Sequence, residues 1–337
     1  LARAEIMLGY HATATRVRIA AIERTTRRGR LAGHKPVLAR SYLALGDIAT
    51  AERLIDESAA LVDRIRRRRP DHKKLNSIDA QIFRSRGKLS MTIGEYRAAE
   101  TWYRKASRSV EIAFRDSPES RGVRFKRALI GAEIARSLVG QGRLIEAEIQ
   151  IRNVLRQTVS QVGPNAALTA VVLMKFTRVL QAQGRLAEAT RMARKILRIY
   201  AHIGVPDDSW QIANIRRLLA HNFVIGRQWD KALVEFEKIR LALQSDRNLF
   251  EKKFARDLGR ALALIGVDRH PEAREIAETV IAERISRLGS KHYATARARG
   301  VLAMALAAGG DTQNALKHFG EALTILMQRS RRSNDVS

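Results

Sequence analysis

The sequence QGRLIEAEIQ at residues 141–150 returns at residues 183–192 as QGRLAEATRM, and the same pattern recurs along the chain. Related turns, each followed by an alanine and a further amphipathic segment, stand at 45–54, 93–102, 226–235, 268–277 and 309–318. The alanines, called anchor alanines below, are Ala51, Ala99, Ala147, Ala189, Ala232, Ala273 and Ala315. Their separations of 48, 48, 42, 43, 41 and 42 residues indicate an internal repeat. A repeat of this length decides the fold, because each copy is one supersecondary unit.

A second set of positions keeps the same register as the anchor alanines. Twelve residues before each anchor stands a small residue: Ala39, Gly87, Ala135, Thr177, Ala220, Ala261 and Ala303. Two antiparallel helices approach closely only where side chains are small, so each pair marks the crossing of a helical hairpin. One hairpin cannot bury both of its faces, and neighbouring hairpins must therefore stack into a continuous core.

These patterns predict an all-α fold, a right-handed α-solenoid of about seven helical hairpins. We expect the repeat array to span residues 32–329. Residues 1–31 are expected to form an N-terminal helical cap, and residues 330–337 a polar tail or linker. The absence of an initiator Met before Leu1 suggests a fragment or a processed chain.

The hairpin pattern resembles the tetratricopeptide repeat, whose usual length is about 34 residues. The longer spacing near 42, with G-x5-T-A at 163–170 and 289–296, resembles the extended repeats of kinesin light chains. The resemblance implies a non-catalytic scaffold for protein–protein interaction. Five positions depart from the family pattern because a large apolar residue is usual there: Lys35, Gly131, Arg216, Asp257 and Arg299.

The segment 311–337 also resembles the tetratricopeptide region that precedes a caspase-like peptidase domain of the CHAT type in bacterial proteins. That resemblance implies a sensor or regulatory region of a larger protein, covalently linked to a C-terminal peptidase domain. The peptidase uses a histidine and a cysteine, whereas this chain contains no cysteine. The resemblance therefore implies that the chain itself is not an enzyme.

Positive charge is abundant and unevenly distributed. The chain has 62 Lys and Arg against 34 Asp and Glu, a net charge of +28. Residues 1–200 hold 40 of the basic and 18 of the acidic side chains, and residues 201–337 hold the other 22 and 16. A GC-rich genome would explain the preference for Arg over Lys, but it would not explain the shortage of acids. The asymmetry predicts an anionic partner for the N-terminal part.

One column of the repeat carries much of this charge. Eleven residues before each anchor stand Arg40, Lys88, Arg136, Arg178, His221, Leu262 and Met304. Arg84 and Arg217 lie four residues before Lys88 and His221, on the same helix face. In a tetratricopeptide-like superhelix this step turns side chains toward the concave groove. The nine residues predict a basic groove that binds an acidic protein segment through arginine forks. A solvated helix face in an Arg-rich chain remains the alternative interpretation.

Other classes of function find less support in the sequence. A nucleic-acid or other polyanion-binding solenoid is the main alternative, but most aromatic residues occupy repeat-core positions instead of forming stacking platforms. The arginine run 64–69 is typical of the solvated last turn of a helix that Pro70 ends. We find no catalytic, cofactor-binding or metal-binding motif, and no apolar stretch of membrane-spanning length. We expect a cytoplasmic protein, with the bacterial periplasm as the alternative.

Overall fold

The computed structural model describes residues 16, 19–20, 28–70 and 75–334. In these residues all regular secondary structure is helical, and the expected all-α fold is confirmed. The chain divides into two compact units, residues 1–205 and 206–337. The predicted N-terminal cap lies almost entirely outside the described residues.

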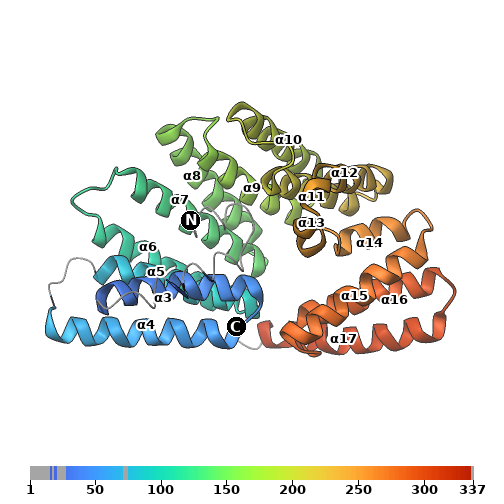
Figure 1. Cartoon of the computed structure of the whole chain (residues 1–337), viewed down its shortest axis with the longest axis horizontal. Helices are drawn as coiled ribbons and strands as arrows, with labels where there is room; N and C mark the ends of the chain where they lie inside the picture. Colours follow the sequence, from blue (N-terminus) through green and yellow to red (C-terminus); the bar gives the residue numbers. More distant parts are fainter. Residues whose placement is uncertain (1–15, 17–18, 21–27, 71–74, 335–337) are drawn as a thin grey trace. The chain divides into compact units, whose positions relative to one another are not determined.

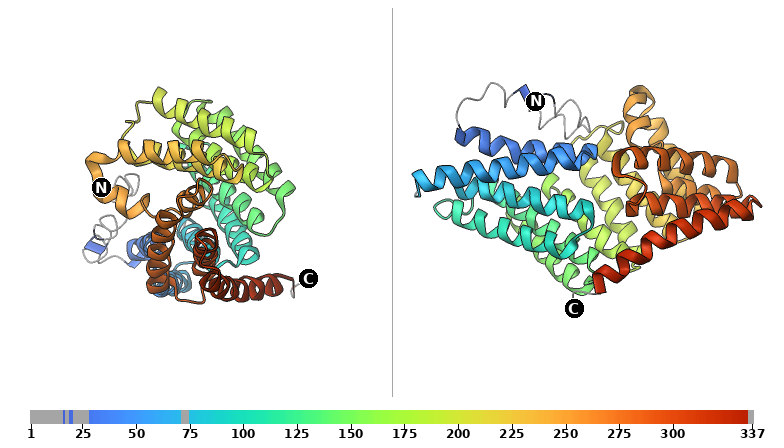
Figure 2. Two further views of the ribbon diagram at one scale, coloured as in Figure 1. Left: turned by 90° about the vertical axis from the view of Figure 1, so that its right-hand side faces the viewer. Right: turned by 90° about the horizontal axis from the view of Figure 1, so that it is seen from below.

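The first unit contains four helical hairpins, whose two helices lie side by side in each case (Figure 1). The helices are α3 (Arg28–Leu45), α4 (Ile48–Arg68), α5 (Leu75–Ile93), α6 (Tyr96–Ala113), α7 (Arg121–Gly140), α8 (Leu144–Val162), α9 (Ala167–Ala182) and α10 (Leu186–His202). In Figure 2 the blue and cyan helices α3 to α6 lie in layers with nearly aligned axes. The first helices of neighbouring hairpins pack on each other at α3–α5 and α7–α9.

The second unit contains three hairpins and one interruption. Its helices are α11 (Trp210–Ile225), α12 (Trp229–Ala242), α13 (Arg247–Lys253), α14 (Leu258–Ile265), α15 (His270–Leu288), α16 (Tyr293–Ala308) and α17 (Thr312–Asn334). A 3₁₀ turn at Gln244–Asp246 and the short α13 stand between the hairpins α11–α12 and α14–α15. Helix α17 continues through residues 330–334, which were expected to belong to the tail.

Burial of the hairpin crossings agrees with the repeat register. Every anchor alanine, and every small residue twelve positions before it, is buried. Each of the seven turns contains one residue with positive φ, which is glycine in five hairpins: Gly46, Gly94, Gly142, Gly184 and Gly310. In the other two hairpins Arg227 and Asp268 adopt φ values of 53° and 60°. The left-handed conformation is needed to reverse the chain in so short a turn.

A repeated ionic clip joins consecutive hairpins of the first unit. Glu100 on α6 accepts hydrogen bonds from Gln141 Nε2 and from an Arg143 Nη atom of the next turn, both at 2.8 Å. One repeat later, Glu148 accepts them from Gln183 Nε2 at 2.8 Å and from Arg185 at 2.7 Å. The recurring letters Q-G-R therefore encode the contact between hairpins as well as the turn itself.

Four of the five departures from the family pattern have ionic partners inside the fold. Lys35 pairs with Glu57, Arg216 with Glu235 at 3.2 Å, and Arg299 with Glu321 at 3.0 Å. In each pair the base comes from the first helix of a hairpin and the acid from the second. Asp257 pairs with His221 at 2.8 Å, and Val154 occupies the space beside Gly131. A buried charge needs such a partner to offset its desolvation.

The crossing of α5 and α6 yields a test of packing. A Cβ atom at Gly87 would lie 2.7 Å from Cε1 of Tyr103, whose ring is fully buried. We expect Gly87→Ala to lower the free energy of unfolding by about 1–3 kcal/mol through overpacking. Gly33→Ala is the matched control, because its Cβ would lie an ordinary 3.9 Å from Ile78; it should stabilise by about 0.5–1 kcal/mol. Urea denaturation measures both, and equal effects would contradict the close crossing.

The turn of the fifth hairpin yields a second test. Arg227 is exposed and holds a left-handed backbone, which costs a non-glycine residue about 1–2 kcal/mol. Arg227→Gly should therefore raise the stability of the second unit by about 0.5–1 kcal/mol, once the greater unfolded-state entropy of glycine is subtracted. Arg227→Ala keeps the Cβ atom and should give no gain. Thermal unfolding compares the variants, and a gain in the alanine variant alone would refute the backbone explanation.

Candidate functional site

The nine residues predicted for partner binding fall into two groups. Those of the first unit are Arg40 on α3, Arg84 and Lys88 on α5, Arg136 on α7 and Arg178 on α9. Those of the second unit are Arg217 and His221 on α11, Leu262 on α14 and Met304 on α16. All nine come from the first helices of their hairpins.

Several of these side chains bond to the next first helix or to the segment that leads into it. Arg40 donates a hydrogen bond to Ser85 Oγ at 2.7 Å, on α5. Arg217 donates to the backbone oxygen of Lys253 at 3.1 Å, and the His221 Nε2 atom lies 2.8 Å from Asp257 Oδ1. The column therefore contributes directly to the stacking of the repeats. That structural role was not foreseen from the sequence.

The two apolar members of the column differ in environment. Leu262 is partly buried and packs against the core of the last two hairpins. Met304 is exposed, with 43% of its surface accessible.

A cluster of six charged side chains lies on three consecutive first helices of the first unit. This charge cluster consists of Arg84, Lys88, Glu133, Arg136, Lys175 and Arg178. Glu133 is its single acid. Lys175 Nζ lies 3.1 Å from one Glu133 oxygen, and Arg136 lies 3.5 Å from the other. The charge cluster therefore combines five cations with one carboxylate, and that carboxylate is already engaged on both oxygens.

The pKa shifts in the charge cluster follow from burial and from this excess of positive charge. Burial alone would raise the pKa of Glu133, but Lys175, Arg136, Lys88 and Arg84 together hold it well below its usual range. Glu133 tends to raise the pKa of Lys175, yet burial, Arg136 and Arg178 outweigh it and leave that pKa low. Burial, followed by the field of Arg136, lowers the pKa of Lys88 to about 8.

Two cations of the charge cluster have no direct partner. Among the described residues, neither Arg84 nor the Lys88 ammonium has a side-chain hydrogen bond or an ion pair. Both side chains are half-buried, four residues apart on α5. The Tyr103 hydroxyl beneath them is also buried without a hydrogen-bond partner. Burial raises the pKa of Tyr103, so the hydroxyl stays protonated and can donate.

Glu133 and Lys175 belong to the charge cluster but were not predicted from the sequence. Both stand fourteen residues before their anchor alanines, three positions from the basic column. Residues three apart on a helix share a face. A search for an acid at that spacing from Arg136 would have found Glu133.

Other classes of site find no support in the described part of the chain. Its residues include no group of three His, Cys, Asp or Glu side chains that could hold a metal ion. None of its helices is long and apolar enough to cross a membrane. The arginine run 64–69 forms the end of α4 and the residue after it, and is largely exposed as expected.

Lys88 yields a stability test with a definite sign. Its folded pKa of about 8 lies below the unfolded value of about 10.4. The unfolded state therefore binds more protons between pH 8 and about 10.4, and stability rises with pH across that window. Lys88→Met should stabilise the first unit at pH 7 by about 1–2 kcal/mol, and the gain should shrink toward about pH 10.5. Urea denaturation at both pH values measures this, and a loss of stability at pH 7 would contradict it.

Comparisons with known proteins agree with the hairpin architecture. Tetratricopeptide-repeat models match residues 37–57, 169–203 and 255–328. All three family matches are to repeats, and none is to an enzyme family. A search of curated proteins returned no match.

Several solved structures resemble the chain. A Rap protein complexed with competence and sporulation factor has a TM-score of 0.67 at 10% identity, covering 98% of this chain and 84% of its own. The Rap conjugation gene regulator of the plasmid pLS20, in complex with the Phr* peptide, has a TM-score of 0.62 at 13% identity, covering 92% and 76%.

A kinesin-light-chain relative is also similar to the chain. The putative kinesin light chain repeats of Podosopora anserina are 20% identical over 61% of this chain and 97% of theirs, with a TM-score of 0.45. At such identities the likeness of the solved structures concerns the fold alone. The family matches identify tetratricopeptide repeats in those three segments, and the Rap structures show that a similar helical fold extends over most of the chain.

Proposed function

We propose that the chain is a protein-interaction scaffold whose first unit binds an acidic segment of a partner on its first helices. The observation that carries the proposal is the pair Arg84 and Lys88, which are half-buried cations without a direct partner in the described residues. Holding Lys88 charged in this place costs stability, because its pKa is lowered. Charged side chains that lower the stability of the fold often belong to functional sites.

The chemistry of the charge cluster favours a carboxylate ligand. Arg84 and Arg136 can each bind a carboxylate with two parallel hydrogen bonds. Glu133 would repel an acid placed against it, but Lys175 and Arg136 already engage this carboxylate. A ligand carboxylate therefore meets a net positive surface.

A protein segment fits this surface better than a nucleic acid does. Tyr103 and Phe176, two aromatic residues of the core beneath the first helices, are buried and offer no face on which a base could stack. The pLS20 regulator that resembles the chain holds a peptide, which supports a peptide or protein partner here.

The polyanion alternative depends on a different observation. The exposed bases Arg191, Arg194 and Arg198 follow one face of α10, in a chain with a net charge of +28. If such residues bind phosphates, the logarithm of the binding constant should fall linearly with the logarithm of the salt concentration. Binding of an acidic segment to half-buried cations should depend less on salt, because buried charges are screened less.

The resemblance of residues 311–337 to the region before a CHAT peptidase extends the proposal to a regulatory role in a larger bacterial protein. In that case the peptidase chemistry would belong to a linked C-terminal domain. The coding sequence that follows Ser337 tests this directly, since such a domain must supply a histidine and a cysteine. We further propose a cytoplasmic location, with the periplasm as the alternative outcome of cell fractionation.

Binding of a fluorescein-labelled peptide of alternating glutamate and leucine tests the proposed surface. Lys88→Met should weaken binding by roughly tenfold, about 1.4 kcal/mol, while it stabilises the fold. Opposite changes in affinity and stability separate a lost contact from misfolding. The double variant Arg136→Glu with Arg178→Glu should abolish binding.

Arg108→Glu provides the control, because Arg108 is exposed on α6 and stands outside the charge cluster. It should leave the affinity unchanged. Single-stranded DNA is measured in parallel over a range of salt concentrations. The scaffold proposal fails if the double variant binds the peptide as well as the parent chain does, or if only DNA binds with a steep salt slope.

A further inference from the structure

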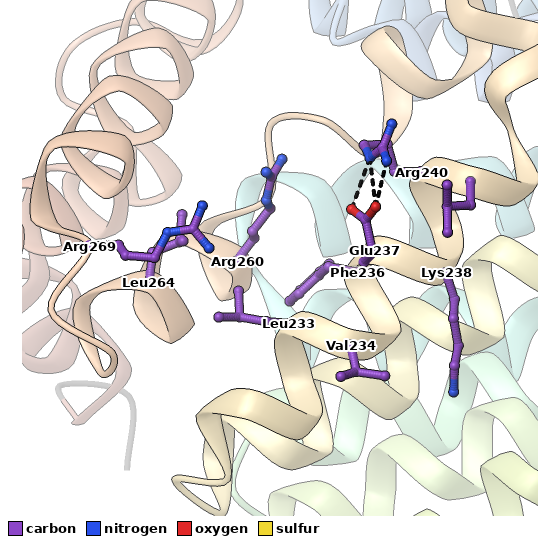
Figure 3. Close-up of a pocket in the computed structure, with 10 residues that line it drawn as sticks. Leu233, Val234, Phe236, Glu237, Lys238, Arg240, Arg260, Leu264 and Arg269 are labelled. Carbon is purple, nitrogen blue, oxygen red and sulfur yellow. Dashed lines mark hydrogen bonds and ion pairs between the residues drawn. The ribbon is translucent and has the colours of Figure 1, made fainter.

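The second unit contains a groove that belongs to no part of the charge cluster. It runs between α12 and α14 and ends at the start of α15, with a volume of about 440 Å³ (Figure 3). Its ten lining residues are Leu233, Val234, Phe236, Glu237, Lys238, Arg240, Leu241, Arg260, Leu264 and Arg269. None of them was singled out as a candidate site from the sequence.

The groove arises from a shortened first helix. Helix α14 has 8 residues, whereas the first helices of the other six hairpins have 16 to 20. Within each unit, a full-length first helix packs on the second helix of the preceding hairpin at α4–α5, α6–α7, α8–α9 and α15–α16. Here the chain before residue 258 forms the 3₁₀ turn and α13 instead. The outer face of α12 is therefore incompletely covered.

Apolar side chains form the floor and one wall of the groove. Phe236 and Leu264 are buried at its base. Val234 and Leu241, seven residues apart on α12, are 52% and 48% exposed. Residues at this spacing lie on one helix face. A bulky apolar side chain placed between them would remove apolar surface from water, which favours binding.

The charged side chains of the rim are paired, with one exception. Arg240 holds Glu237 through two guanidinium nitrogens, at 2.8 and 2.5 Å. Arg269 holds Glu272 in the same way, at 2.6 and 2.7 Å. The half-buried Arg260 interacts with both carboxylates only at longer range. Within the described residues it has no hydrogen bond or ion pair.

We propose that the groove between α12 and α14 is a second docking site, for a partner segment that places a large aliphatic or aromatic side chain beside a carboxylate. The apolar side chain would enter between Val234 and Leu241 above Phe236. The carboxylate would take the Arg260 guanidinium, whose planar fork accepts two oxygens. Glu237 and Glu272 do not compete for this fork, because each is held by its own arginine.

The apolar wall and Arg260 together disfavour a partner that is only anionic or only apolar. A polyanion without apolar groups would leave Val234 and Leu241 exposed. A purely apolar segment would cover Arg260 without pairing it, and a buried unpaired charge costs several kcal/mol. The site does not depend on the charge cluster of the first unit, and either surface can be tested without the other.

A displayed library of random linear peptides, selected on the full chain, supplies the probe. We expect the enriched sequences to combine an acid with a neighbouring Leu, Ile, Phe or Trp. A selected peptide should bind Arg260→Glu roughly tenfold or more weakly, because the reversed charge repels its carboxylate. Val234→Asp should weaken it similarly by making the apolar wall polar.

Lys231→Glu is the matched control, since Lys231 lies on α12, is exposed and does not line the groove. It should bind the peptide as the parent chain does, and circular dichroism should show the same helix content in all variants. The proposal is wrong if no peptide is enriched on the parent chain over Arg260→Glu. It is equally wrong if the selected peptides lose affinity for Lys88→Met and keep it for Arg260→Glu, since they would then bind the first unit.

Discussion

The close crossing of two helices at small residues is the constraint on which the rest of this structure depends. In each hairpin the anchor alanine and the small residue twelve positions before it are both buried. Larger side chains would hold the helices apart and open cavities along the core. The Gly87–Tyr103 contact shows how closely two helices approach, because the buried ring of Tyr103 occupies the space that a Cβ atom at position 87 would need. The crossings fix which helix faces meet the next hairpin.

That register has an electrostatic consequence in the first unit. Positions eleven and fourteen residues before the anchor come together on neighbouring first helices, and Lys175, Arg136, Lys88 and Arg84 all act on Glu133. Burying like charges side by side costs free energy, since each lowers the pKa of its neighbours. A scaffold selected for stability alone would place apolar or acidic residues there. The chain retains Arg84 and Lys88 instead, as a surface ready to receive a carboxylate would require.

The second unit uses the same hairpins with a different result. There the column residues Arg217 and His221 are occupied by the polypeptide between α12 and α14. Because this segment replaces the first part of a helix, α12 loses part of its cover. An apolar groove forms on α12, beside an arginine that has no ion pair within the described residues. The irregular segment before α14 therefore has two effects. It pairs the basic side chains of α11, and it leaves a groove on α12. The two units present different chemistry on a shared architecture.

The sequence by itself determined the repeat register, the all-helical fold, the seven hairpins and the solvated end of α4. These follow from local periodicity, from small residues at fixed spacing and from turn chemistry, all of which are visible along the chain. It also placed most of the positive charge in the first 200 residues. It did not reveal that Glu133 and Lys175 join the basic column, that Arg40 and His221 tie neighbouring helices, or that α14 is short. Only the tertiary structure decided these features, because the partner of a charged side chain depends on which helices pack together. The spacing of residues along one helix does not encode the distance between side chains on different helices.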